Sequence, residues 1–219
     1  MNDILRPFLR WFVLIFFDDI LIYNKTWADH LRYLRAVLST LRQHHLFIKR
    51  VKCAFGVTSI SYLGHVISKV GVAMDPAKVQ AIHDWSVPRS AQVVRGFLGL
   101  AGYYHKFVHN FGSIATPLTA LLKKEGFSWT DAAAVGFDVL KAAVTLAPIL
   151  AMPDFTKDFV VECDASSHGF GAVLIQDAHL IVFFSRPIVP RHRSHTAYER
   201  ELICLVHAIQ HWRPYLWGY

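Results

Sequence analysis

Two uninterrupted apolar runs, each about as long as a β-strand, lie on either side of a pair of aspartates near the start of the chain. Residues 11–17 precede Asp18 and Asp19, and residues 20–23 follow them. Both runs are rich in β-branched and aromatic residues, so the pattern predicts a tight hairpin with both carboxylates at its tip. Such like charges repel each other, and a divalent cation would remove the repulsion. The alternative is a solvated Asp-Asp turn, the commoner fate of such a pair.

Apolar residues at helical spacing follow the predicted hairpin. Thr26, with Asp29 three residues further on, has the pattern of a capping box at the start of a helix. Short strands are predicted at residues 46–48 and 60–67, and strand pairs beside a packed helix form a layered α+β arrangement. The apolar stripe of the helix consists of Trp27, Leu31, Leu34, Leu38 and Leu41.

The middle of the chain, residues 76–145, has amphipathic helical patterns only. N-cap residues predict three of its helix starts, at Asp75, Ser90 and Thr130. Aromatic side chains in this region could stack on nucleic-acid bases, but core packing is the expected role for at least two of them. These aromatic residues are Tyr103, Tyr104 and Phe107.

From Pro148 onward the pattern returns to strands. Three apolar segments, at residues 159–164, 171–175 and 180–184, predict an antiparallel meander, and a final helix follows. One stripe of that helix is apolar and consists of Tyr198, Leu202, Leu205, Val206, Ile209 and Trp212. We interpret the opposite face as a solvated polar face rather than a zinc site. It carries Cys204, His207 and His211.

Composition excludes a disordered chain and disfavours a membrane protein. Of the 219 residues, 53% are hydrophobic and only 18% are charged, so the chain can bury a core. The longest apolar run is far shorter than the roughly 18 residues that span a bilayer. Three widely spaced cysteines without a Cys-x-x-Cys pair favour free thiols in a reducing compartment, either the cytoplasm or the nucleus.

The net charge of +7 favours a polyanionic partner, either a nucleic acid or an anionic membrane surface. Charge alone does not distinguish such a protein from an ordinary basic one. Basic residues do gather near the candidate sites, however, and Lys49, Arg50 and Lys52 form one such cluster.

Five sequence boxes together carry a resemblance to a known family. Residues 16–23 resemble the YxDD box of reverse transcriptases, in the form found in gypsy-type LTR retrotransposons. Four further boxes follow in the family's order and resemble a palm motif, the primer-grip hairpin, the first thumb helix and the start of an RNase H domain. They are residues 52–55, 62–68, 97–104, and the pair 163–166 with 198–202.

This resemblance implies a fragment of a gypsy-type LTR retrotransposon Pol polyprotein. The implied fold is α+β, with the C-terminal part of a reverse transcriptase palm in residues 1–75 and helical thumb and connection in residues 76–126. A truncated RNase H-like α/β domain would occupy residues 127–219. The implied activities are RNA-directed DNA polymerase and ribonuclease on RNA–DNA hybrids. The implied partners are RNA, DNA, the hybrid and deoxynucleoside triphosphates, with no membrane.

The same resemblance assigns roles to individual residues. Asp18 and Asp19 would hold magnesium or manganese for nucleotidyl transfer, since hard carboxylate oxygens suit these ions. Asp164 and Glu201 would be the catalytic metal ligands of the ribonuclease. Lys52 would contact the nucleotide triphosphate or donate a proton. The turn that would hold the primer consists of Leu63, Gly64 and His65.

Both implied sites are expected to be catalytically incomplete. The family pattern adds another aspartate to the first site and two more acids to the second, and this sequence matches none of the three. The alternative is a non-catalytic nucleic-acid-binding remnant or a host-adopted domain, and a basic amphipathic membrane-binding protein is a third, weaker possibility. An unpaired edge of the last sheet would also favour self-association.

Overall fold

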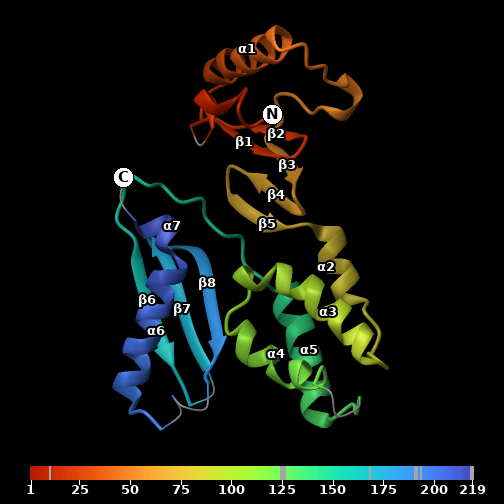
Figure 1. Ribbon diagram of the computed structural model, residues 1–219, viewed down its shortest axis with the longest axis vertical. Helices are drawn as coiled ribbons and strands as arrows, with labels where there is room; N and C mark the ends of the chain where they lie inside the picture. The colour runs from red at the N-terminus through yellow and green to blue at the C-terminus, as the bar shows by residue number, and fades with distance from the viewer. Residues whose placement is uncertain (10, 124–126, 168, 190–191, 193, 218–219) are drawn as a thin grey trace. The chain divides into compact units, whose positions relative to one another are not determined.

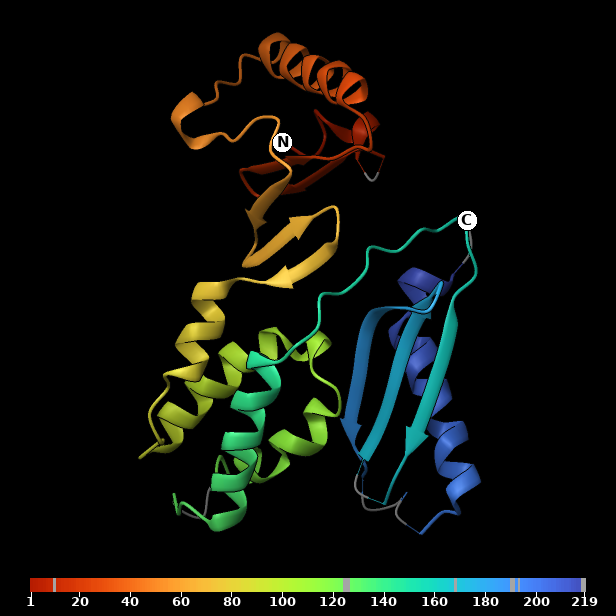
Figure 2. The same cartoon turned by 180° about the vertical axis from the view of Figure 1, so that it is seen from behind.

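The chain divides into two compact units, Met1–Tyr62 and Leu63–Tyr219. The computed structural model describes all residues except 10, 124–126, 168, 190–191, 193 and 218–219 (Figures 1 and 2). Among the described residues, no helix is both long enough and apolar enough to cross a membrane.

The first unit begins with the predicted hairpin. Its elements are η1 (Arg6–Phe8), β1 (Val13–Phe16), β2 (Asp19–Ile22), α1 (Trp27–Gln43), η2 (Arg50–Lys52) and β3 (Ser59–Tyr62). β1 and β2 pair antiparallel, with Phe16 opposite Asp19 and Val13 opposite Ile22. Because side chains alternate along a strand, one face of the hairpin carries Val13, Ile15, Ile20 and Ile22. These residues belong to the hydrophobic cluster that also contains Val37 and Leu41 of α1.

Helix α1 starts as the sequence predicts, since Asp29 N donates to Thr26 Oγ1 at 3.1 Å. Its predicted buried stripe is partly wrong. Trp27 and Leu31 are exposed, whereas Val37 is 1% exposed and Tyr33 stacks on Phe12 with ring centroids 3.8 Å apart. The helix therefore turns its Tyr33–Val37–Leu41 face to the hairpin, because these side chains fit against Phe12 and Val13.

Residues 46–48 do not form the predicted strand. Leu46 packs against the cluster under α1, but Phe47 is 96% exposed. Among the described residues of its unit, this segment has no neighbouring strand to pair with. Its β propensity alone is therefore not enough to form a strand.

The second unit contains a hairpin, a group of helices, and a three-stranded sheet with its covering helix. Its elements are β4 (His65–Ser68), β5 (Gly71–Met74), α2 (Pro76–His83), α3 (Ala91–Tyr103), η3 (His105–Phe107), α4 (Phe111–Ala120), α5 (Asp131–Thr145), β6 (Val160–Ala165), β7 (Gly169–Gln176), β8 (His179–Pro187), α6 (Ala197–His211) and α7 (Arg213–Leu216). The α+β class predicted from the sequence is confirmed. The predicted domain limits at residues 75 and 126 stay predictions.

The helix starts predicted at Asp75, Ser90 and Thr130 are confirmed, because each side chain accepts a hydrogen bond from a backbone N–H of its helix's first turn. α2, α3, α4 and α5 share one hydrophobic cluster. Its largest side chains that are almost fully buried are Phe97, Tyr104, Phe107, Phe137, Ile82, Leu118 and Leu140.

The segment after α5 returns to the β4–β5 hairpin. Val72 N donates to Leu150 O at 2.8 Å, and Leu150 N donates back to Val72 O at 2.9 Å. Gly71, the residue before this bridge, has φ +142°, a conformation that side chains rarely adopt. The next residue, Ala151, donates to Leu180 O at 2.7 Å, so one short segment bonds to both β5 and β8.

The predicted meander is present as the sheet β6–β7–β8, which is antiparallel throughout. Helix α6 lies across one face of this sheet (Figures 1 and 2), where Phe170, Ala172 and Leu174 pack with Cys204 and Ala208. The region from η3 to α4 meets the opposite face. There His109 contacts Phe183 with ring centroids 5.4 Å apart, and Gly112 N donates to Ser185 Oγ at 2.8 Å.

The interpretation of the α6 faces is wrong in part, although Trp212 of the expected stripe is buried and His211 of the expected polar face is exposed. Cys204, expected on a solvated face, is completely buried, while the expected apolar stripe is largely exposed. The exposed fractions are 76% for Tyr198, 53% for Leu202, 47% for Val206 and 45% for Ile209. The small side chains of Cys204 and Ala208 allow the helix to approach the sheet closely, and Trp212 fills the space at its far end.

We predict that Gly71→Ala lowers the free energy of unfolding of the second unit by roughly 2–4 kcal/mol. A Cβ atom there would lie 2.2 Å from Leu150 O, on a backbone with positive φ. Gly99→Ala on α3 is the matched control, because its Cβ would meet no atom within 4 Å, and it should gain about 0.5–1 kcal/mol. Urea unfolding followed by circular dichroism measures both; equal stability of the two variants would contradict the prediction.

Candidate active sites

The Asp-Asp pair lies at the tip of the β1–β2 hairpin, as predicted. Phe16 pairs with Asp19, which leaves Phe17 and Asp18 as a two-residue loop. Phe17 has φ +51° and is 82% exposed. A left-handed conformation is costly for a non-glycine residue, of the order of 1–3 kcal/mol, and such strain is found mainly at functional turns.

Strand alternation places Asp19 on the face of the hairpin that points away from the α1 cluster. The same face carries Leu14, Phe16 and Leu21. Tyr62 is close enough that the charge of Asp19, added to the larger effect of burial, raises the pKa of the Tyr62 hydroxyl. Asp18 and Asp19 are themselves exposed.

Neither aspartate is neutralised by a described residue of its own unit. In the described residues 1–62, no Lys, Arg or His forms an ion pair with Asp18 or Asp19. The other two acids of this unit are already engaged, since Asp3 pairs with Arg6, and Asp29 accepts from Thr26 Oγ1 and pairs with Arg32. The unit therefore offers two available carboxylates.

Lys52 lies in the short helix η2 and is exposed, as are Lys49 and Arg50. Two large apolar side chains in the same segment, Phe47 and Val51, are 96% and 95% exposed. Basic groups thus alternate with exposed apolar groups, of which Phe47 is aromatic, on one accessible segment, an arrangement that suits a nucleic-acid strand.

The predicted primer-holding turn is fixed from inside the second unit. Leu63 and Gly64 both have left-handed φ values, +49° and +69°. Tyr103 Oη donates to Leu63 O at 2.6 Å, and Tyr104 Oη donates to Gly64 O at 2.7 Å. These tyrosines therefore bind the turn, and the expectation that at least two of the three aromatics lie in the core is confirmed for Tyr104 and Phe107, each 1% exposed.

His65 is buried beside the same turn, with 7% of its surface exposed. Its Nδ1 lies 2.7 Å from Leu63 O and donates to it, while its ring stacks on Phe107 at 5.6 Å. Burial, together with the charge of Lys106, lowers the pKa of His65 despite the opposing hydrogen bond to Leu63. The neutral imidazole is therefore the form that this site holds.

Asp164 lies on β6, at an exposed position one residue from the end of the strand. Its partner on β7 is Gly171, and a Cβ at Gly171 would come within 2.6 Å of Asn110 Oδ1. Asp164 therefore belongs to the sheet face that meets the η3–α4 region. Glu162 shares that face two residues earlier and is also exposed, a neighbour that sequence reasoning missed although the i, i+2 spacing indicates it.

Glu201 comes from α6, on the other side of the sheet, and is exposed. Two thiols lie in the hydrophobic cluster between α6 and the sheet, Cys163 of β6 and Cys204 of α6, and Cys204 Sγ donates to Gly171 O at 3.3 Å. Burial raises the pKa of Cys163, with a further contribution from Glu201. It raises the pKa of Cys204 to about 12, with a small contribution from Asp164. Both carboxylates thus act on the same thiol pair.

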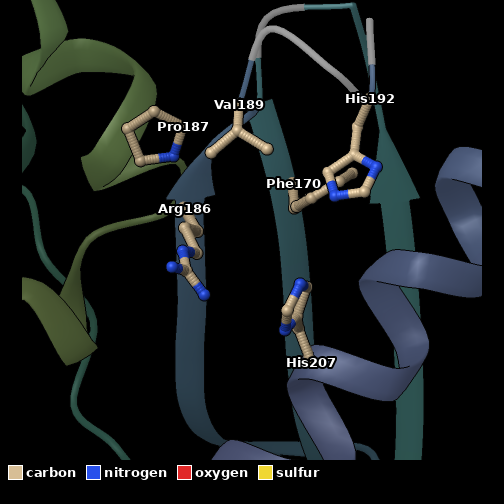
Figure 3. Close-up of a pocket in the computed structure, with 6 residues that line it drawn as sticks. All are labelled: Phe170, Arg186, Pro187, Val189, His192 and His207. Atoms are coloured by element: carbon tan, nitrogen blue, oxygen red, sulfur yellow. The ribbon is translucent and has the colours of Figure 1, made fainter.

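A small cavity of about 50 Å³ lies near the Asp164 end of the sheet (Figure 3). Phe170 on β7 lines it, with Arg186 from β8 and His207 from α6. Phe170 pairs with Ala165, the residue after Asp164. The cavity therefore begins one residue pair along the sheet from Asp164. Its described lining contains no carboxylate, and it therefore lacks the ligands that a hard cation prefers.

The donors at both candidate sites fit a hard divalent cation in kind. Within the described part of the chain, no three or more His, Cys, Asp or Glu residues converge as a ready-made metal site. Magnesium is commonly bound by only one or two carboxylates together with substrate phosphates and water. Asp18 and Asp19 suit this mode of binding.

Two family models match the chain. One, described as reverse transcriptase (RNA-dependent DNA polymerase), matches residues 1–67. The other, described as an RNase H-like domain found in reverse transcriptase, matches residues 129–219. These two matches include the Asp18–Asp19 hairpin and the Asp164–Glu201 pair, respectively.

Retrotransposon polyproteins match the full length of the chain. The Pol polyprotein of transposon 297 from Drosophila melanogaster is 39% identical over 224 residues, covering 100% of this chain and 21% of the relative. The Pol polyprotein of transposon gypsy from the same organism is 33% identical over 231 residues, covering 100% and 22%. The chain thus spans about a fifth of the length of these relatives.

A third relative is short. An uncharacterised mitochondrial protein of Arabidopsis thaliana is 49% identical over 132 residues, covering 59% of this chain and 84% of that protein. Among solved structures, the foamy viral protease-reverse transcriptase in complex with an RNA/DNA hybrid has a TM-score of 0.86 at 22% identity, covering 96% of this chain and 29% of that one. This similarity shows a shared fold.

Fold and sequence together define a reverse transcriptase segment joined to an RNase H-like segment. The chain contains reverse transcriptase and RNase H-like family domains, and its homologues include the Pol polyproteins of gypsy-type retrotransposons. Enzymes of this family generally use divalent metal ions.

We predict that the second unit loses stability as the pH falls below the ordinary histidine value of 6.5. In the unfolded chain His65 takes up a proton there, whereas the folded site, with its lowered pKa, resists it, so protonation favours unfolding. The contribution of His65 to the free energy of unfolding is fully present above pH 6.5. It is lost progressively as the pH falls toward the lower pKa of the folded state. The groups around the imidazole are Lys106, Tyr103, Tyr104 and Phe107.

Urea midpoints measured between pH 8 and pH 5.5 test this prediction. His65→Phe should flatten the dependence on pH, whereas His83→Gln, at an exposed histidine that ends α2, should leave it unchanged. An equally steep dependence in His65→Phe would show that other histidines cause it.

Proposed function

We propose that this chain supplies part of the polymerase site and part of the ribonuclease site of a retrotransposon reverse transcriptase. The carrying observation is the hairpin that presents Asp18 and Asp19, exposed and without an ion pair to any described residue of their unit, in a segment that matches the reverse transcriptase family. The proposed polymerase reaction is attack of a primer 3′-oxygen on an incoming deoxynucleoside triphosphate. The proposed nuclease reaction is hydrolysis of the RNA strand of an RNA–DNA hybrid.

In the polymerase site, Asp18 and Asp19 would hold magnesium or manganese, and Lys52 would approach the triphosphate. In the ribonuclease site, Asp164 and Glu201 would be the metal ligands. When bound, divalent cations stabilise the attacking and leaving oxygens of such displacements. The turn at Leu63, Gly64 and His65 would hold the primer strand.

Nucleic-acid binding is the part of the function for which the chain offers the most complete set of residues. The net charge is +7, and Lys49, Arg50 and Lys52 are all exposed on one segment. The foamy viral relatives of similar fold were solved with an RNA/DNA hybrid and with double-stranded DNA. We propose RNA, DNA and their hybrid as partners of this chain.

We predict that the chain by itself extends no primer and cleaves no hybrid. Two-metal chemistry needs more ligands than two carboxylates, and the remaining acids of the first unit are engaged elsewhere. Primer extension on a homopolymer template and a labelled-hybrid cleavage assay, both with magnesium or manganese, give the measurement. Extension abolished by Asp18→Asn, or cleavage abolished by Glu201→Gln, would show that the residues present suffice.

Binding to single-stranded nucleic acid should weaken steeply with salt. The logarithm of the binding constant should fall with the logarithm of salt concentration with a slope of about −0.7 per neutralised phosphate. Replacing Lys49, Arg50 and Lys52 by Gln should make the slope shallower by up to about 2 units. Replacing Lys25, Lys69 and Lys78 instead is the charge-matched control. Fluorescence anisotropy measures both; a flat salt response of the native chain would contradict the proposal.

A non-catalytic nucleic-acid-binding role is the second candidate function. The short Arabidopsis relative, most of which this chain covers, is the observation that favours it. Adding the missing acids in trans, on a longer polyprotein segment, distinguishes the two roles. Activity that depends on Asp18 and Asp19 would support the enzyme, and continued inactivity with intact binding would support the second role.

Self-association is proposed on two features of the second unit. β6 and β8 are the outer strands of the sheet, and the α6 stripe of Tyr198, Leu202, Val206 and Ile209 is exposed. We predict that light scattering finds species larger than a monomer and that Leu202→Lys with Ile209→Lys shifts them toward the monomer. A monodisperse monomer of the native chain would refute this.

A further inference from the structure

Two consecutive tyrosines at the end of α3 reach back 40 residues to the Leu63–Gly64 turn. Tyr103 Oη donates to Leu63 O at 2.6 Å, and Tyr104 Oη donates to Gly64 O at 2.7 Å. The two side chains therefore bind neighbouring carbonyl groups of one two-residue turn, and neither contact is a consequence of local secondary structure.

Each of these carbonyl oxygens accepts a second hydrogen bond. Leu63 O also accepts from His65 Nδ1 at 2.7 Å, and Gly64 O also accepts from Asp75 N at 3.1 Å. Four donors thus hold two acceptors. They come from α3, from β4 and from the N-cap of α2, so the turn is joined to three elements of its unit.

The turn needs such support because its backbone conformation is unfavourable. Leu63 has φ +49°, and a left-handed leucine costs of the order of 1–2 kcal/mol. Gly64 has φ +69°, and a Cβ there would lie 3.1 Å from the Tyr104 hydroxyl, so the tyrosine packs directly on the glycine. Without the tyrosines, extended conformations of Leu63 would compete with the observed one.

The two tyrosines differ in burial, which helps to separate their effect on the conformation of the turn from their effect on the stability of the core. Tyr104 is 1% exposed, and burial, with a further effect of Asp75, raises its pKa to about 12, so its hydroxyl keeps its proton. Tyr103 is 50% exposed and contributes little to the hydrophobic core. Removing the Tyr103 hydroxyl therefore perturbs the turn while leaving the core nearly intact.

We propose that Tyr103 and Tyr104 are positioning residues that hold the Leu63–Gly64 turn in its nucleic-acid-binding conformation. The importance of this clamp for binding rests on the proposed function, in which the turn holds the primer strand. The tyrosine rings act through their hydroxyl groups and the turn's carbonyls, rather than by stacking on bases.

The test compares the full chain with Tyr103→Phe, Tyr104→Phe and the double variant. Tyr198→Phe, at a tyrosine that is 76% exposed on α6, is the matched control. Amide hydrogen exchange of Asp75 reports the clamp directly, because that N–H donates to Gly64 O. The amide of Val72, which donates to Leu150 O, is the internal reference within the same unit.

The double variant should exchange the Asp75 amide about 3–10-fold faster at unchanged Val72 exchange, the factor expected for a lost hydrogen bond. Its Kd for a primer–template duplex should rise by about the same factor, and Tyr103→Phe should show a smaller change of both quantities at an unchanged Tm. Unaltered Asp75 exchange in the double variant would overturn the clamp. Faster exchange with an unaltered Kd would overturn the positioning role.

Failure of the proposed function gives a different result. If the native chain does not bind nucleic acid, the proposed function is refuted. The amide hydrogen exchange rate of Asp75 still decides whether the clamp exists. Should Tyr104→Phe fail to fold, Tyr103→Phe carries both measurements, since its ring is half exposed and its loss of a hydroxyl leaves the core in place.

Discussion

Alternation of side chains along a strand is the constraint on which both candidate sites depend. Each small sheet must bury one face against a helix to be stable, and the next residue along the strand then faces the other way. In β1–β2 the buried face belongs to Val13 and Ile20, and Asp19 is consequently displayed on the opposite one. In β6, Cys163 and Ala165 face α6, which leaves Asp164 on the far side.

This constraint explains why the polar chemistry of the chain lies where packing is weakest. A carboxylate in the buried face would lose its hydration without a partner, at a cost of several kcal/mol. Asp19 on the open face and Asp18 in the adjoining loop are both exposed, so both remain available to a cation. The same open face leaves apolar side chains such as Leu14 and Phe16 partly exposed. The geometry that makes the carboxylates available therefore also limits how much apolar surface the hairpin buries.

Local signals predicted most of the fold. The N-caps at Asp75, Ser90 and Thr130, the Asp-Asp hairpin and the meander all depend on residues a few positions apart, which a sequence displays directly. Which face of a helix is buried, in contrast, depends on residues far away in the sequence. On α6 the helix packs with Cys204 and Ala208 because small residues allow close approach, although a count of hydrophobic side chains favours the opposite stripe.

The left-handed residues are the other part that the sequence does not reveal. A glycine at position 64 indicates a positive φ there, but Leu63 and Phe17 also adopt positive φ values, +49° and +51°. For Leu63 the reason lies 40 residues away, in the hydroxyl groups of a tyrosine pair whose pattern indicates only core packing or base stacking. We proposed the Phe17 turn for metal binding and the Leu63 turn for holding the primer, and both adopt conformations that neighbouring residues alone would not favour. Four other non-glycine residues with positive φ, namely His45, Asn110, Asp177 and Ala178, lie outside these two turns, so a left-handed conformation indicates a site only together with the contacts around it.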